Sequence, residues 1–185
     1  MLHFIVWLTA LLLTFDVCLS DRKWDYEPLS IEATTSDASK LSLTTEVERL
    51  SRSEFAFTGT IEFNYDIDDT TTIEAVSYRS NTGNEDDYKL LPWKLQKQSA
   101  KEFFKGYYEQ YIFKNLGHCS NLPQLDNIDP WPKNTYKFEH CVVTGEGMPE
   151  LVPEGFYKVV FSVDGEVDWV ITAVAKITAK TDLYG

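Results

Sequence analysis

A strict alternation of apolar and polar residues between residues 54 and 67 is the most regular pattern in the chain. Because successive side chains of a strand point to opposite faces, the alternation predicts one long strand with a single buried face. Its inward positions are Phe55, Phe57, Gly59, Ile61, Phe63, Tyr65 and Ile67. Such a strand fits an ordinary core as well as the wall of a ligand cavity. Gly59 is expected to mark a bulge or bend.

Shorter segments, which alternate or, at residues 70–79, are rich in β-forming residues, predict further strands on both sides of the long one. They lie at residues 29–33, 41–47, 70–79, 136–143, 156–163 and 166–177. Short turns join the first four strands, which favours a meander. Asp164-Gly165 predicts a tight hairpin between the last two strands, with Tyr157, Val159 and Phe161 on one face of it.

The period changes after residue 99, where the spacing predicts one amphipathic helix over about residues 100–116. Ser99 followed by Glu102 matches a capping box, and Gly117 suits the residue just past the helix end. The predicted apolar face consists of Phe104, Tyr107, Tyr108, Tyr111 and Ile112. This face fits a core stripe or the wall of a cavity shared with the long strand.

A proline-rich segment at residues 120–135 predicts a long loop that carries the isolated Trp131. Long loops are often functional. We therefore expect Trp131 either at a rim, touching lipid or a membrane surface, or packed against the domain.

Residues 1–20 resemble a cleaved signal peptide, because a short apolar run precedes Ser20 and the charged residues that follow it. A signal anchor is the alternative. Residues 21–185 then form a single secreted, extracellular domain. Cleavage would remove Cys18 and leave Cys119 and Cys141, an even pair in an oxidising compartment. The sequence therefore predicts a disulfide between these two cysteines.

The net charge of −12 at pH 7, without a cluster of basic residues, argues against a nucleic-acid partner. The chain contains no nucleophile elbow, phosphate loop, dinucleotide fingerprint or zinc-protease helix, so we expect no enzyme activity and no cofactor. His118 and His140 each precede a cysteine, which raises a zinc hypothesis. Adjacent strand residues point to opposite faces, so His140 and Cys141 would not easily converge on one metal, and no metal site is predicted.

Several segments carry a resemblance to known families. The end of the chain from Gly145 to Lys180, with its proline-bearing segment and terminal hairpin, is similar to the GM2 activator protein. A closer resemblance is to the insect CheB chemosensory proteins, carried by YEPLSIE (26–32), SNTGNEDDYKL (80–90), CSNLP (119–123), WPKNTY (131–136), CVVTG (141–145) and GEVDW (165–169).

This resemblance implies a mainly β fold, an antiparallel β-cup around a lipid-binding cavity, with one amphipathic helix. It also implies a role in contact chemosensation and pheromone response. The GM2 activator has several disulfides, whereas this chain offers one cysteine pair after cleavage.

From the residues and the resemblance together, we expect a non-enzymatic carrier or presenter of an apolar ligand, a lipid or cuticular hydrocarbon pheromone. The alternative is a secreted protein-interaction module, an accessory to a membrane receptor or channel, with a self-filled core. The expected ligand-binding residues are Phe55, Phe57, Ile61, Phe63, Tyr65, Phe104, Tyr107, Tyr108, Trp131, Tyr157, Val159 and Phe161.

Overall fold

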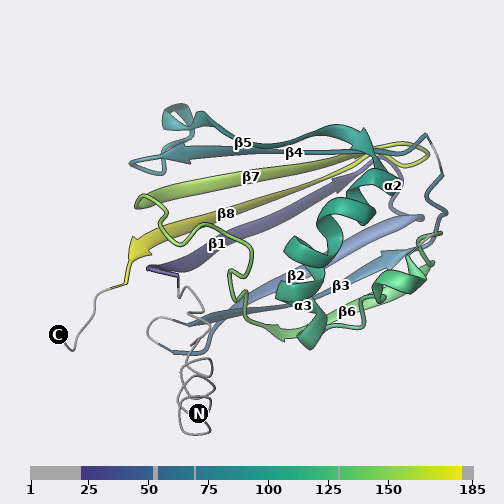
Figure 1. Ribbon diagram of the computed structural model, residues 1–185, viewed down its shortest axis with the longest axis horizontal. Helices are drawn as coiled ribbons and strands as arrows, with labels where there is room; N and C mark the ends of the chain where they lie inside the picture. Colours follow the sequence, from purple (N-terminus) through teal and green to yellow (C-terminus); the bar gives the residue numbers. More distant parts are fainter. Residues whose placement is uncertain (1–21, 52–53, 69, 129, 181–185) are drawn as a thin grey trace, which may run out of the picture.

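The computed structural model describes residues 22–51, 54–68, 70–128 and 130–180. The expected signal peptide and Cys18 lie outside these residues. Within them the chain forms eight strands, a helical segment and two separate 3₁₀ turns, η1 (Glu85–Asp87) and η4 (Leu125–Asn127) (Figure 1). The strands are β1 (Trp24–Thr35), β2 (Leu41–Arg49), β3 (Phe55–Phe63), β4 (Thr72–Ser80), β5 (Lys89–Ser99), β6 (Asn134–Cys141), β7 (Gly155–Asp164) and β8 (Trp169–Ala179).

The strands form two antiparallel sheets that do not close into a barrel. The larger sheet has the order β1-β8-β7-β4-β5, and the smaller sheet has the order β2-β3-β6. The prediction of a mainly β, antiparallel fold with one helix is confirmed. The predicted meander is wrong, because β1 pairs with β8 and β4 pairs with β5 and β7. Alternation reports which face of a strand is buried, but it does not report which strand lies beside it.

The long predicted strand is shorter than expected. β3 ends at Phe63, and Tyr65 and Ile67 lie in the segment that leads to β4. Tyr65 is nevertheless buried, and its hydroxyl accepts a hydrogen bond of 2.8 Å from the indole Nε1 of Trp169 on β8. This bond links the segment between β3 and β4 to β8 of the larger sheet. We call the face of each sheet that carries Phe63 or Phe161 its inner face.

Gly59 lies beside an irregularity in the pairing of β3 with β6. The extra residue is on β6, where His140 has a φ of 49°, rather than at the glycine. A Cβ at Gly59 would lie 2.6 Å from the backbone oxygen of Thr44 on β2. The glycine therefore permits the close approach of β2 to β3.

The helical segment joins β5 of the larger sheet to the region beside β6 of the smaller sheet (Figure 1). It consists of α2 (Ala100–Phe103), the π-helix η2 (Phe104–Phe113), α3 (Lys114–Leu116) and the 3₁₀ turn η3 (Gly117–Cys119). The predicted capping box is confirmed, because the Ser99 hydroxyl accepts from the Glu102 amide and the Glu102 carboxylate accepts from the Ser99 amide. Gly117 has a φ of −64° and begins a 3₁₀ turn, so its prediction as a left-handed end residue is wrong.

The π-helical middle changes which side chains share a face. The wider turn of a π-helix places residues four apart above one another and separates residues three apart. Phe103, Tyr107 and Tyr111 accordingly stack in one ladder, whereas Phe104 and Tyr108 point toward a different set of neighbours. The single apolar face expected from a regular helix is therefore wrong, and Tyr107 and Tyr111 are exposed.

A disulfide and side-chain hydrogen bonds join the end of the helical segment to β6 and the loop after it. The predicted disulfide is confirmed, and it joins Cys119 at the end of the helical segment to Cys141 at the end of β6. Buried Asn115 donates to the Glu146 oxygen and accepts from the Gly145 amide, which ties α3 to the loop after β6. The β7–β8 hairpin is confirmed, but its connection spans residues 165–168 rather than two residues.

The core consists of two clusters of buried side chains. One follows the smaller sheet and contains Leu41, Phe63, Tyr65, Tyr136, Phe138, Cys141 and Val167. The other lies under the start of the helix and contains Ile73, Ala100, Phe103 and Val163. Ile67 and Trp169 pack against both clusters and so connect them. No helix in the described part of the chain is both long enough and apolar enough to span a membrane.

Candidate binding site

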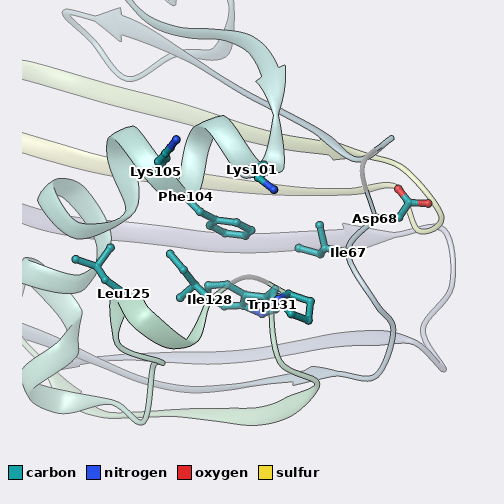
Figure 2. A pocket seen from close by; sticks show the side chains of 9 residues that line it. Ile67, Asp68, Lys101, Phe104, Lys105, Leu125, Ile128 and Trp131 are labelled. Carbon is teal, nitrogen blue, oxygen red and sulfur yellow. The ribbon is translucent and has the colours of Figure 1, made fainter.

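A pocket of about 240 Å³ opens between the first turns of the helix and the loop that leads to β6 (Figure 2). We call it the Trp131 pocket. Its wall is mostly apolar, with charged side chains from the helix and from the loop before β4. The lining residues are Ile67, Asp68, Lys101, Phe104, Lys105, Leu125, Ile128, Pro130 and Trp131.

Trp131 is the aromatic residue that links the pocket to the core. Its indole stacks on Phe104 with ring centroids 4.8 Å apart and an interplanar angle of 13°. It also meets Tyr108 edge-on at 5.5 Å, and Phe63 and Tyr136 at 6.3 and 5.5 Å. The structure thus packs Trp131 against the domain and also places it on the pocket wall. Its buried Nε1 has no hydrogen-bond acceptor among the described residues.

Two buried tyrosines hold the loop that carries Trp131. The Tyr108 hydroxyl donates to the Pro123 carbonyl oxygen at 2.6 Å, and the Tyr136 hydroxyl donates to the Pro132 carbonyl oxygen. Burial raises the pKa of Tyr136 to about 12, and it raises the pKa of Tyr108 well above that of an exposed tyrosine. Both hydroxyls therefore remain neutral donors at physiological pH, and the loop stays attached to the helix and to β6.

Charged groups of both signs lie around the pocket. Asp68 is engaged locally, because its Oδ1 accepts from the amides and hydroxyls of Thr70 and Thr71 at 2.6 to 3.2 Å. The hydroxyl and amide of Thr70 hold the pKa of the Asp68 carboxyl below its usual value. Lys101 and Lys105 stand one helical turn apart on the helix side of the pocket (Figure 2).

The predicted residues of the long strand lie mainly in the core rather than on the pocket wall. Phe63 and Tyr65 are 4% and 2% exposed and stack on each other at 4.5 Å. Phe57 and Ile61 pack against the same cluster. Phe55 lies apart from them, under the Arg49 guanidinium, and it borders a second, more polar pocket.

The predicted residues of the helix and hairpin also separate into groups. Phe161 contacts Phe103 at 5.6 Å and Trp169 at 5.7 Å, so it belongs to the second core cluster. Val159 shares the inner face with Phe161 but is 42% exposed. The Tyr157 hydroxyl donates to the Pro153 oxygen. The helix therefore covers the larger sheet at Phe161 and leaves its inner face open at Val159.

Of the twelve predicted ligand-binding residues, Phe104 and Trp131 line the Trp131 pocket. Sequence reasoning missed its other lining residues. Ile67 continues the alternation of the long strand and could have been found from it. Leu125 begins the short 3₁₀ helix η4 (Leu125–Asn127) and Ile128 follows it, and a single turn of this length leaves no periodic pattern in the sequence. Lys101 and Lys105 occupy polar helix positions that normally face solvent.

The fold and the site describe a mainly antiparallel β domain with one disulfide, a bridging helix and an aromatic pocket. Residues 73–159 match a family model described as "Protein of unknown function (DUF1091)". The matched segment runs from β4 into β7 and includes the helix, the disulfide and the loop of Trp131. A search of curated proteins finds no match to the chain.

Proposed function

We propose that the protein is a secreted, non-enzymatic carrier or presenter of an apolar ligand, a lipid or cuticular hydrocarbon, in contact chemosensation. The chemosensory part of the proposal rests on the resemblance to the insect CheB proteins. The match of residues 73–159 to the DUF1091 model is consistent with that resemblance. The ligand part rests on the Trp131 pocket.

The size and lining of the pocket support the uptake of one end of an apolar molecule. Its volume of about 240 Å³ exceeds that of the roughly 150 Å³ apolar cavity that holds benzene in an engineered protein. Phe104 and Trp131 present stacked aromatic surface, and Ile67 and Ile128 add aliphatic surface. Covering about 100 Å² of hydrocarbon would contribute roughly 2.5 kcal/mol before the cost of association. A longer ligand would have to gain further affinity outside the pocket.

A second candidate function is a protein-interaction module, an accessory to a membrane receptor or channel. The observation that favours it is the close packing of Phe63, Tyr65 and Trp131, which fills the inner face of the smaller sheet with the protein's own side chains. In this case the aromatic cluster stabilises the domain, and an outer surface would bind the partner.

Leu125→Trp separates the two functions. Leu125 lines the pocket but is 41% exposed, so a larger side chain has room to enter the pocket without overpacking the core. We expect unchanged thermal stability and weaker uptake of the neutral probe N-phenylnaphthylamine. Leu151→Trp, at a position 73% exposed and outside the pocket lining, is the matched control. Equal uptake by all three proteins, or no uptake by the wild type, would contradict ligand binding in this pocket.

Native mass spectrometry of the secreted protein provides an independent measurement. A carrier should co-purify with an apolar molecule that is depleted in Leu125→Trp and retained in Leu151→Trp. An interaction module should give the mass of the mature chain alone.

A further inference from the structure

The outer face of the larger sheet, opposite the face that carries Phe161, has an apolar centre. Val76 on β4 and Val160 on β7 lie side by side on it, and Val170 and Val174 on β8 lie diagonally across from Val160. We call these four residues the valine patch. All four are partly exposed, because the helical segment packs against Phe161 on the other side of the sheet (Figure 1).

The loop between β4 and β5 covers one end of the outer face. The Lys158 ammonium group pairs with Glu85 of this loop and lies 4.4 Å from the centre of the Tyr88 ring. A Cβ at Gly83 would lie 3.0 Å from the Phe156 ring. The loop therefore neutralises Lys158 and covers Phe156, whereas the valine patch stays partly exposed. Contiguous exposed apolar surface of this kind is typical of a site where another molecule binds.

Opposite charges border the valine patch at the two edges of the sheet. One row of paired residues crosses all five strands and consists of Glu32, Thr172, Val160, Val76 and Lys94. Glu32 and Lys94 are exposed, and neither forms an ion pair with another residue in the described ranges. β1 carries three acidic residues and no basic one, and β5 carries three lysines and no acidic residue. The outer face is thus acidic at one edge, apolar in the middle and basic at the other edge.

We infer that the valine patch is the interface of a homodimer whose two-fold axis runs parallel to the strands of the larger sheet. This axis stacks the outer faces of two copies and places β1 of one copy over β5 of the other, since both strands are two positions from β7. Glu32 of each copy then faces Lys94 of the other, and Val160 lies at the axis. An axis across the strands would stack β1 on β1 and bring like charges together.

The outer face is large enough for a weak dimer. With strands about 4.8 Å apart and about 3.3 Å per residue, five strands of about nine residues present roughly 700 Å². A standard stable interface buries about 800 Å² per partner. Because the loop between β4 and β5 occupies one end of the face, we expect a dissociation constant in the micromolar range. Salt should weaken the dimer, because the charged pairs lie at its exposed edges.

Sedimentation equilibrium of the purified protein at low salt measures the association. We expect the wild type to pass from monomer to dimer in the micromolar range. Val160→Lys should weaken the dimer at least about tenfold, because it places two ammonium groups at the axis. Val159→Lys is the matched control, since it adds the same charge to the inner face of the same strand and should leave the association intact.

Reversal of the edge charges tests how the two copies are arranged. Glu32→Lys should weaken the dimer about fivefold, because the new ammonium group faces Lys94 of the other copy. Glu32→Lys/Lys94→Glu should restore the association, since opposite charges face each other again. Both positions are exposed, so the variants should keep the wild-type fold, which circular dichroism checks. A double variant as weak as Glu32→Lys would overturn the proposed axis.

Two further results would overturn the dimer itself. One is a wild type that stays monomeric up to about 1 mM. The other is a dimer that Val159→Lys disrupts and Val160→Lys does not, which would place the interface on the inner face. The inference is independent of the carrier function, because Trp131 packs on the inner face of the smaller sheet, away from the valine patch.

Discussion

The two sheets present similar apolar patterns on their inner faces, but they are covered to different extents. On the smaller sheet, Phe63 is 4% exposed, because Tyr65 and Trp131 lie over it. On the larger sheet, Val159 is 42% exposed although β7 is a central strand. The proline-rich loop covers the inner face of the smaller sheet. The helix covers the inner face of the larger sheet only as far as Phe161. Burial is thus decided by the segments that cross a sheet as well as by the sheet itself.

We call the inner face of the smaller sheet the filled face, and the inner face of the larger sheet around Val159 the open face. The largest expected effect on stability comes from removing a buried ring from the filled face. Phe63→Ala should lower the free energy of unfolding by about 3–5 kcal/mol, because it removes a buried ring and leaves a cavity. Val159→Ala, on the open face, should change it by about 0.5 kcal/mol or less. Urea denaturation measures both values. Similar losses in the two variants would contradict the contrast between the sheets.

The disulfide should contribute nearly as much to the stability of the filled face. Cys119→Ser/Cys141→Ser removes a cross-link between residues 22 positions apart, and the expected loss is roughly 3 kcal/mol in the chain-entropy model. Reducing agent should lower the melting temperature of the wild type and leave that of the double variant unchanged. A reduced wild type as stable as the oxidised protein would contradict this prediction.

Alkaline pH should loosen the loop that covers the filled face. The pKa of Tyr136 is raised from 10.0 to about 12 in the folded protein, so the native state retains a proton that the unfolded state loses. The stabilisation is therefore complete below pH 10 and is lost as the pH rises toward 12. Thermal unfolding between these pH values measures the loss.

Tyr136→Phe is the matched variant for this pH dependence. It lacks the hydroxyl bond to Pro132 and should be less stable at neutral pH by about 1 kcal/mol. Its stability should also fall less steeply above pH 10. Tyr108, whose pKa is raised by burial as well, should account for part of the remaining loss. An unchanged alkaline slope in Tyr136→Phe would contradict the assignment.

The smallest expected effect on stability is that of filling the open face. Val159→Phe should change the free energy of unfolding by about 0.5 kcal/mol or less, because the added ring would extend into solvent. A loss of about 1–3 kcal/mol would indicate overpacking, and hence a covered face. Probe uptake by the same variant sharpens the comparison. Reduced uptake would extend the ligand site to this face, and unchanged uptake would limit the site to the Trp131 pocket.

Several features could be predicted from the sequence because they depend on neighbouring residues. The alternation in residues 54–67 identified the buried face of β3, and Ser99 with Glu102 identified the start of the helix. Asp164-Gly165 identified the hairpin of β7 and β8. The cysteine count identified the disulfide once Cys18 was assigned to the signal peptide. Alternation and helix capping depend on residues that are close together in the sequence, and the disulfide was inferred from the number of cysteines.

The remaining features depended on contacts between distant segments. β5 escaped prediction because an exposed edge strand shows no clear alternation, and its residues are largely solvent-accessible. Tyr107 lies outside the expected apolar face because residues 104–113 form a π-helix, which has more residues per turn than an α-helix. The prediction assumed the α-helical number of residues per turn.

The sequence by itself determined which residues form apolar strand faces, where the helix begins and which cysteines pair. Only the tertiary structure decided the order of the strands, the exposure of Val159 and the pocket beside Trp131. The physical reason is the distance along the sequence between the residues that interact. Local patterns set the conformation of each segment, whereas burial and pocket formation depend on which distant segments pack against it.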